Sequence, residues 1–100
     1  MPARIAIDEQ QIAEFCQRRR IKSLALFGSV LRDDFRPESD VDVLIELAPE
    51  AHISLSGFVR VQAELSALLG REAHLVDKRS LRNPFRRRAI METAEEVYAA

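Results

Sequence analysis

Two neighbouring stretches, Leu26-Phe27-Gly28-Ser29-Val30-Leu31-Arg32 and Ser39-Asp40-Val41-Asp42-Val43-Leu44-Ile45, decide the fold of this chain. The first is an apolar run that stops at a Gly-Ser turn, as the end of a buried strand does. The second is a strand that opens with two carboxylates. Because alternate residues of a strand share a face, Asp40 and Asp42 are predicted to project from one face of a sheet. Val41 and Val43 then point the other way, into the core.

Further strands and connections follow from the same reasoning. Strands are predicted over residues 23–27, 41–47 and 72–76, and an extended tail is expected at Val97 and Tyr98. Residues 29–34 are expected to form a turn or a short helix, and the loop at 36–39 contains Pro37.

Three longer helices are marked by their ends. Asp8 can cap the first, Ser54 can cap the second, which Gly70 ends, and Asn83 caps the third, which starts at Pro84. The spacing of apolar residues predicts the buried faces. In the first helix they are Ile12, Phe15 and Cys16. In the second they are Leu55, Phe58, Val59, Gln62, Leu65, Leu68 and Leu69. In the third they are Phe85, Ala89, Ile90 and Ala94.

The second and third strands flank one long helix, so they are expected to run parallel through a right-handed crossover. The first and second strands are joined by a short excursion and are expected to be antiparallel. We therefore predict the α/β (α+β) class, with a small mixed sheet of three or four strands flanked by about four helices.

The composition is that of one globular domain, residues 1–100, with 47% hydrophobic residues, 31% charged residues and a net charge of -1. That charge gives no general attraction to nucleic acid or to an acidic membrane. The single cysteine, Cys16, cannot form an internal disulfide and is expected to be a buried small hydrophobe. Without a signal peptide or a run of about 20 apolar residues, the chain is expected to be complete and cytoplasmic.

The two carboxylates indicate chemistry rather than packing. Asp40 and Asp42 repel each other on one face, and a fold tolerates such a pair most easily around a cation. Mg²⁺ suits the pair because it prefers hard oxygen ligands and keeps positions open for water and phosphates. Gly28 and Ser29 lie before a helix start, where a phosphate can approach the backbone, and Arg32 follows one turn later. Together these are the parts needed for phosphoryl or nucleotidyl transfer.

The motif Gly28-Ser29-x-x-Arg32 followed by Ser39-Asp40-x-Asp42 resembles the signature of the nucleotidyltransferase superfamily typified by DNA polymerase beta. The small size resembles its minimal nucleotidyltransferases (MNT proteins). The segments 53–71 and 81–88 also look like this family, so the resemblance covers nearly the whole chain.

This resemblance implies specific roles. Asp40 and Asp42 would be catalytic and hold Mg²⁺, and ATP would be the substrate. Gly28, Ser29 and Arg32 would bind the nucleotide, while Ser39 would support the carboxylate loop. Many such proteins are antitoxins in a type VII-like toxin–antitoxin pair with a HEPN-domain ribonuclease, and some transfer AMP from ATP to a tyrosine of that toxin. The expected partner is therefore a HEPN-domain toxin, in a hetero-oligomer, with no membrane.

The chain departs from the family pattern at position 74, where His74 replaces the expected third carboxylate. Asp77 lies three residues further and should face elsewhere. A neutral histidine can act as a general base, so His74 is a candidate catalytic residue. The alternative is a weakened site in a protein that neutralises its partner by binding alone. Asp33, where the family often has glycine, is a lesser departure.

Two basic segments leave alternatives open. Arg18, Arg19 and Arg20 are expected to complement the end of a helix dipole, with a nucleic-acid patch as the alternative. The basic residues between 78 and 88 form either a solvated helix surface or a contact with an acidic partner or nucleotide phosphates. Direct nucleic-acid binding is disfavoured because no base-stacking aromatics interleave with these charges.

Overall fold

The computed structural model describes residues 7–28 and 40–100. Its elements, in chain order, are α1 (Glu9–Arg18), β1 (Ile21–Phe27), β2 (Val41–Leu47), α2 (Leu55–Leu69), β3 (Ala73–Asp77), the 3₁₀ turn η2 (Lys78–Ser80), α3 (Pro84–Thr93) and β4 (Glu95–Ala99). The strands form one sheet in the order β3-β2-β1-β4. The short helix or turn expected over 29–34 lies outside the described residues.

The sheet is mixed, as predicted. β1 pairs antiparallel with β2 and with β4, while β2 pairs parallel with β3 across the α2 crossover. The extended tail expected at Val97 and Tyr98 is a full edge strand, β4. In the described part of the chain, no helix is long and apolar enough to cross a membrane.

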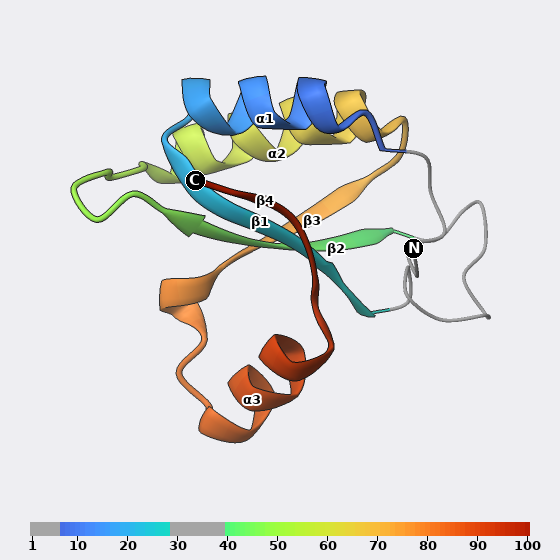
Figure 1. The fold of residues 1–100 in the computed structure, drawn as a ribbon. Coiled ribbons are helices and arrows are strands. Elements are labelled where there is room, and N and C mark those ends of the chain that lie inside the picture. The colour runs from blue at the N-terminus through green and yellow to red at the C-terminus, as the bar shows by residue number, and fades with distance from the viewer. Residues whose placement is uncertain (1–6, 29–39) are drawn as a thin grey trace.

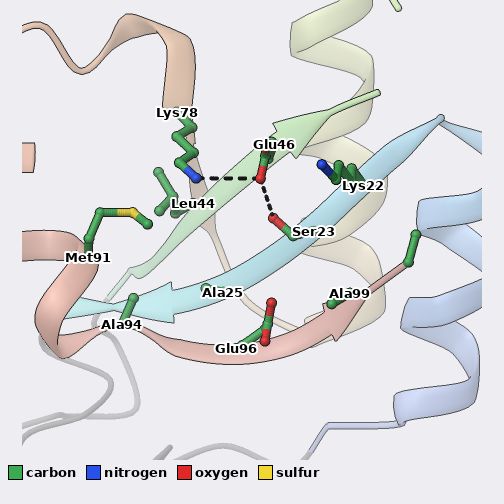
Figure 2. A pocket seen from close by; sticks show the side chains of 11 residues that line it. Lys22, Ser23, Ala25, Leu44, Glu46, Lys78, Met91, Ala94, Glu96 and Ala99 are labelled. Atoms are coloured by element: carbon green, nitrogen blue, oxygen red, sulfur yellow. Dashed lines mark hydrogen bonds and ion pairs between the residues drawn. The ribbon is translucent and has the colours of Figure 1, made fainter. Parts of the chain in front are cut away.

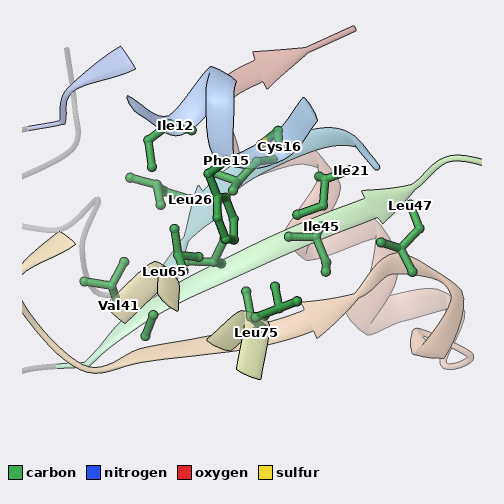
Figure 3. Close-up of a cluster of buried hydrophobic side chains, with 14 of the residues drawn as sticks. Ile12, Phe15, Cys16, Ile21, Leu26, Val41, Ile45, Leu47, Leu65 and Leu75 are labelled. Atoms are coloured by element: carbon green, nitrogen blue, oxygen red, sulfur yellow. The ribbon is translucent and has the colours of Figure 1, made fainter. Parts of the chain in front are cut away.

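Helices cover both faces of the sheet (Figure 1). α1 and α2 lie together on one face, and α3 lies on the other. The larger core fills the space between the sheet and the α1–α2 layer, and Phe15, Cys16 and Leu65 at its centre have no exposed surface. Figure 3 shows the β2 side chains Val41 and Ile45 pointing into this core. Cys16 is fully buried, which confirms the prediction, and this burial raises the pKa of its thiol to about 12.

A smaller apolar cluster attaches α3 to the opposite face. Phe27 of β1 and Leu44 of β2 pack there with Leu81 and with Ile90 of α3. Leu44 belongs to the alternate set of β2 residues that points away from the α1–α2 layer. Both faces of β2 are therefore apolar near its middle, and the carboxylate of Asp42 lies at its start.

The predicted helix ends are confirmed. The Asp8 carboxylate accepts the Gln11 N–H, the Ser54 hydroxyl accepts the Gly57 N–H, and Asn83 caps α3. Gly70 ends α2 in the left-handed conformation, with φ at 72°.

The predicted buried faces of the later helices are partly wrong. Leu55 and Val59 of α2 are 83% and 56% exposed, whereas Val61, which the spacing did not single out, is buried. Phe85 of α3 is 84% exposed, although Ile90 is buried as expected. α2 carries apolar residues on more than one side, so its own pattern could not choose the face that meets β3.

Two polar side chains of α2 occupy the outer edge of β3. The Ala73 N–H donates to the Ser66 hydroxyl at 2.9 Å, and the Leu75 N–H donates to the Gln62 side-chain oxygen at 3.0 Å. An unpaired strand edge is a template for pairing with another chain. Gln62 and Ser66 therefore both satisfy the backbone and block this edge.

We expect Gln62→Leu to destabilise the fold by about 1–3 kcal/mol, because it leaves the Leu75 N–H without its acceptor. The free energy of unfolding from urea titration measures this loss. Gln17→Leu, the same change at an exposed α1 position, is the matched control and should change stability by less than about 0.5 kcal/mol. Equal effects of the two substitutions would show that the Gln62 bond contributes nothing specific.

Candidate active site

The site residues meet where β1 ends and β2 and β3 begin. In the sheet register, Asp42 lies opposite Phe27 of β1 on one side and opposite His74 of β3 on the other. Its strand neighbours Val41 and Val43 are fully buried in the α1–α2 core. The Asp42 side chain therefore projects from the face that carries α3, as the alternation of polar and apolar residues predicted.

Gly28 directly follows β1 and has a left-handed backbone, with φ at 77°. A Cβ added at this position would lie under 3.0 Å from the Asp42 Oδ2, closer than real Cβ atoms come to another heavy atom. Glycine is therefore favoured here for two reasons, the backbone conformation and the close approach of the Asp42 carboxylate. The sequence interpretation had considered only the approach of a phosphate.

Asp40 stands immediately before β2 and contacts the third strand. Its Oδ2 lies 3.1 Å from the Nε2 of His74, and the two side chains are 45% and 56% exposed. His74 thus occupies the position where sequence comparison with the family pattern expects a carboxylate. If the imidazole donates Nε2–H to Asp40, its Nδ1 is the nitrogen that can accept a proton.

Asp77 does not join these residues. It caps η2, where its Oδ1 accepts the Arg79 N–H at 2.9 Å. In the register Asp77 lies opposite Ile45, so it is on the other face of the sheet from His74, as its spacing predicted.

Ser29, Arg32 and Ser39, the other predicted site residues, lie outside the described residues, as does Asp33. Their roles stay predictions. Within residues 7–28 and 40–100, no three His, Cys, Asp or Glu side chains form a ready-made metal site. The two carboxylates supply the hard oxygen donors that Mg²⁺ prefers, and a site of this kind leaves positions for water and substrate oxygens. The donor set therefore fits Mg²⁺ better than a metal that favours nitrogen or sulfur.

Sequence reasoning missed the continuation of this face along β2. Residues 42, 44 and 46 alternate along the strand, and Glu46 accepts a hydrogen bond from Ser23 at 3.3 Å. Glu46 also lies 3.5 Å from the Lys78 ammonium. The alternation Asp42-x-Leu44-x-Glu46 could have predicted that Glu46 lies on the same face of the sheet as Asp42.

The two left-handed glycines provide a controlled test of the Gly28 contact. Gly28→Ala and Gly70→Ala both place a side chain at positive φ, which costs about 1–2 kcal/mol. Only the Gly28 Cβ would collide with Asp42, since an added Cβ at Gly70 meets nothing within 4 Å. We therefore expect Gly28→Ala to lower the free energy of unfolding more than Gly70→Ala, as measured by urea titration. Equal losses would mean that Asp42 does not need the space beside Gly28.

Comparison with known proteins agrees with this geometry. The model of the nucleotidyltransferase domain family matches residues 9–97. The protein adenylyltransferase MntA of Thermococcus cleftensis is 33% identical over 79 residues, which cover 79% of this chain and 78% of that protein. A solved toxin–antitoxin structure with AMP-PNP has a TM-score of 0.74 at 18% identity, covering 94% of this chain and 75% of that one. A structure of a tri-AMPylated Shewanella oneidensis HEPN toxin in complex with an MNT antitoxin has a TM-score of 0.65 at 18% identity, covering 92% and 70%.

The structural matches, at this low identity, establish the shared fold, whereas the domain match and the sequence relative establish ancestry. The domain match includes Gly28, Asp40 and Asp42. This chain belongs to the nucleotidyltransferase domain family.

Proposed function

We propose that this chain transfers AMP from ATP to a hydroxyl of a HEPN-domain toxin and acts as the antitoxin of that pair. The observation that carries the proposal is the placement of Asp42 between Gly28 and His74, with Asp40 in contact with His74. The name of the Thermococcus relative and the AMPylated HEPN toxin in the Shewanella complex support the same reaction. AMP-PNP in the related toxin–antitoxin structure supports ATP as the substrate.

The proposed reaction is one nucleophilic displacement. The partner's hydroxyl oxygen, on a tyrosine in the simplest case, forms a bond to the α-phosphorus of ATP. The bond from that phosphorus to the bridging oxygen of the pyrophosphate breaks, and the hydroxyl proton passes to a base. The products are an AMP ester on the partner and free pyrophosphate, so no further reactant is required.

The residues divide this work. Asp40 and Asp42 would hold Mg²⁺, which supplies neutralisation of the triphosphate charge when bound. Gly28, Ser29 and Arg32 would bind the nucleotide phosphates, and Ser39 would support the segment that leads to Asp40. Because Gly28 lies so close to Asp42, a phosphate bound at Gly28 would lie beside the carboxylate that would hold Mg²⁺.

His74 is the proposed base. Its contact with Asp40 holds the imidazole beside the carboxylates, and more than half of its side chain is exposed to an incoming hydroxyl. A histidine in this position can accept the proton that a carboxylate would accept in the usual family pattern.

The second candidate function is neutralisation of the toxin by binding alone. The specific observation in its favour is the same His74, which removes a negatively charged metal ligand from the site. In this version Asp40 and Asp42 are remnants of an active ancestor, and the partner is inhibited by being covered in a hetero-oligomer.

The carboxylate role is tested by incubating this chain with its proposed HEPN-domain partner, ATP and Mg²⁺. We expect intact-mass spectrometry to show AMP added to the partner by the wild-type chain and no addition by Asp42→Ala. Glu14→Ala, an exposed carboxylate on α1, is the control and should retain the wild-type rate. An adduct formed equally well by Asp42→Ala would remove Asp42 from the reaction.

Position 74 separates the two candidate functions. If His74 is the base, His74→Ala should lower kcat by roughly 10²–10⁴-fold with little change in the KM for ATP. His74→Asp should then retain measurable transfer. If the wild-type chain forms no adduct and His74→Asp creates one, the chain acts by binding alone.

A further inference from the structure

The chain has two arginine clusters, and every arginine of the first is paired within the fold. Arg18 and Arg19 pair with Glu64 at 2.7 and 2.6 Å, and Arg20 pairs with Glu50. Burial acts to raise the pKa of Glu64, but the hydrogen bonds from Arg19 and Arg18 outweigh it and hold that pKa below its ordinary value. This cluster therefore joins the end of α1 to α2 and to the loop between β2 and α2, and each of its arginines has a carboxylate partner within the fold.

The second cluster is compensated only in part. Its cations are Lys78, Arg79, Arg82, Arg86, Arg87 and Arg88. Ion pairs connect Lys78 to Glu46, Arg79 to Asp77 and Arg88 to Glu92. The other three, Arg82, Arg86 and Arg87, are exposed and form no ion pair with the described residues 7–28 and 40–100. An excess of positive charge therefore remains on this side of α3.

A large aromatic side chain is exposed among these arginines. Phe85 is 84% exposed and belongs to the first turn of α3. Asn83 accepts the N–H groups of Phe85 and Arg86, and Pro84 begins the helix, so the backbone that carries Phe85 is well anchored. Exposed aromatic and arginine side chains on a fixed backbone are the typical composition of binding hot spots between proteins.

A hollow lies beside this segment, between α3 and the sheet (Figure 2). It has a volume of about 380 Å³, with Ala25, Leu44, Met91 and Ala94 among its lining residues. The short alanine side chains leave the space open, and the Ser23–Glu46–Lys78 contacts lie along it.

A second hollow of about 320 Å³ shares Glu46 and Lys78 with the first and extends to Arg79 and Arg87. An apolar recess therefore leads towards the arginine-rich segment.

This surface is on the same side of the sheet as the candidate active site. Phe27 lies opposite Asp42 in the register and packs in the apolar cluster that holds Ile90 of α3. Leu44, which lines the hollow, is two residues after Asp42 on β2 and shares its face. Figure 1 shows α3 on the face opposite α1 and α2. A protein bound to α3 would thus lie on the face of the sheet from which Asp42 projects.

We propose that the α3 surface, defined as residues 78–88 with the adjoining hollows, docks an acidic segment of the partner protein, with an apolar pocket of that partner receiving Phe85. The inference rests on the proposed function, because it takes the modified partner as the occupant. Uncompensated arginines attract the acidic groups and orient the approach, while Phe85 supplies apolar contact area.

A protein partner suits this surface better than RNA. Sequence reasoning expected no exposed aromatic among these charges, and the structure shows one, Phe85. Single-stranded nucleic acid is bound by several stacking aromatics along a continuous basic groove. Among the described residues, Phe85 is the one phenylalanine or tyrosine that is exposed, and a single ring provides no run of stacking positions for successive bases.

The first test uses two equally exposed apolar residues on opposite faces, Phe85 at 84% and Leu55 at 83%. Binding of the proposed HEPN-domain partner is measured by calorimetry without ATP. We expect Phe85→Ala to raise Kd by about tenfold or more and Leu55→Ala to leave it within about twofold. In the transfer assay, Phe85→Ala should raise the KM for the partner and leave kcat unchanged at saturation. Equal effects of the two substitutions, or none, would overturn the docking surface.

The second test reverses charge. We expect Arg82→Glu/Arg86→Glu to weaken binding and to reduce its dependence on salt concentration, while Arg60→Glu on α2 changes neither. Binding of a single-stranded RNA oligonucleotide is measured with the same variants. If the double variant loses RNA binding and keeps protein binding, the surface belongs to RNA and the proposal is wrong.

The two proposals fail separately. Loss of binding in Phe85→Ala, with no AMP adduct from the wild-type chain, supports the docking surface and rejects the transfer reaction. An AMP adduct that forms with unchanged KM in both the Phe85 and the arginine variants supports the reaction and rejects the docking surface. All these side chains are exposed, and an unchanged circular dichroism spectrum and Tm verify that each variant is folded.

Discussion

The central position of β2 is the constraint on which the rest of the structure depends. One set of alternate residues on this strand is buried against α1 and α2, and the other set begins with Asp42. A shift of register by one residue would move Val41 and Val43 to the α3 face and bury the carboxylate. Burial of Val41 and Val43 in the apolar core thus fixes the direction in which the Asp42 carboxylate points. The hydrophobic effect therefore positions a candidate catalytic group, although the core residues take no part in the reaction.

The close approach of Gly28 to Asp42 is the second consequence of that register. β1 ends opposite Asp42, and the residue after it must turn without a side chain. On the other side, the parallel register brings His74 opposite Asp42, and Asp40 reaches its imidazole. The three strand ends therefore gather a backbone, two carboxylates and a histidine, although no single strand could form the site alone.

Charge is distributed unevenly over the two faces of the sheet. The arginines at 18–20 serve the fold, because each forms an ion pair with Glu64 or Glu50. On α3 the excess positive charge remains at the surface, together with Phe85. On the side of α1 and α2, the arginines at 18–20 pair with glutamates of the same fold, whereas Arg82, Arg86 and Phe85 stay exposed on the other side. This asymmetry is consistent with a protein that performs its function against another macromolecule.

The sequence by itself determined the strands, the helix ends, the polar alternation in β2 and the candidate carboxylates. These features depend on residues a few positions apart, such as Asp8 with Gln11 or Asp40 with Asp42, so local patterns are sufficient to predict them. Only the tertiary structure decided which side of α2 is buried and that Leu55, Val59 and Phe85 are exposed. It also decided that residues 95–99 form a fourth strand, that Glu64 pairs with two arginines and that His74 contacts Asp40. Each of these depends on contacts between distant segments, which the packing of the whole sheet selects and which no local pattern contains.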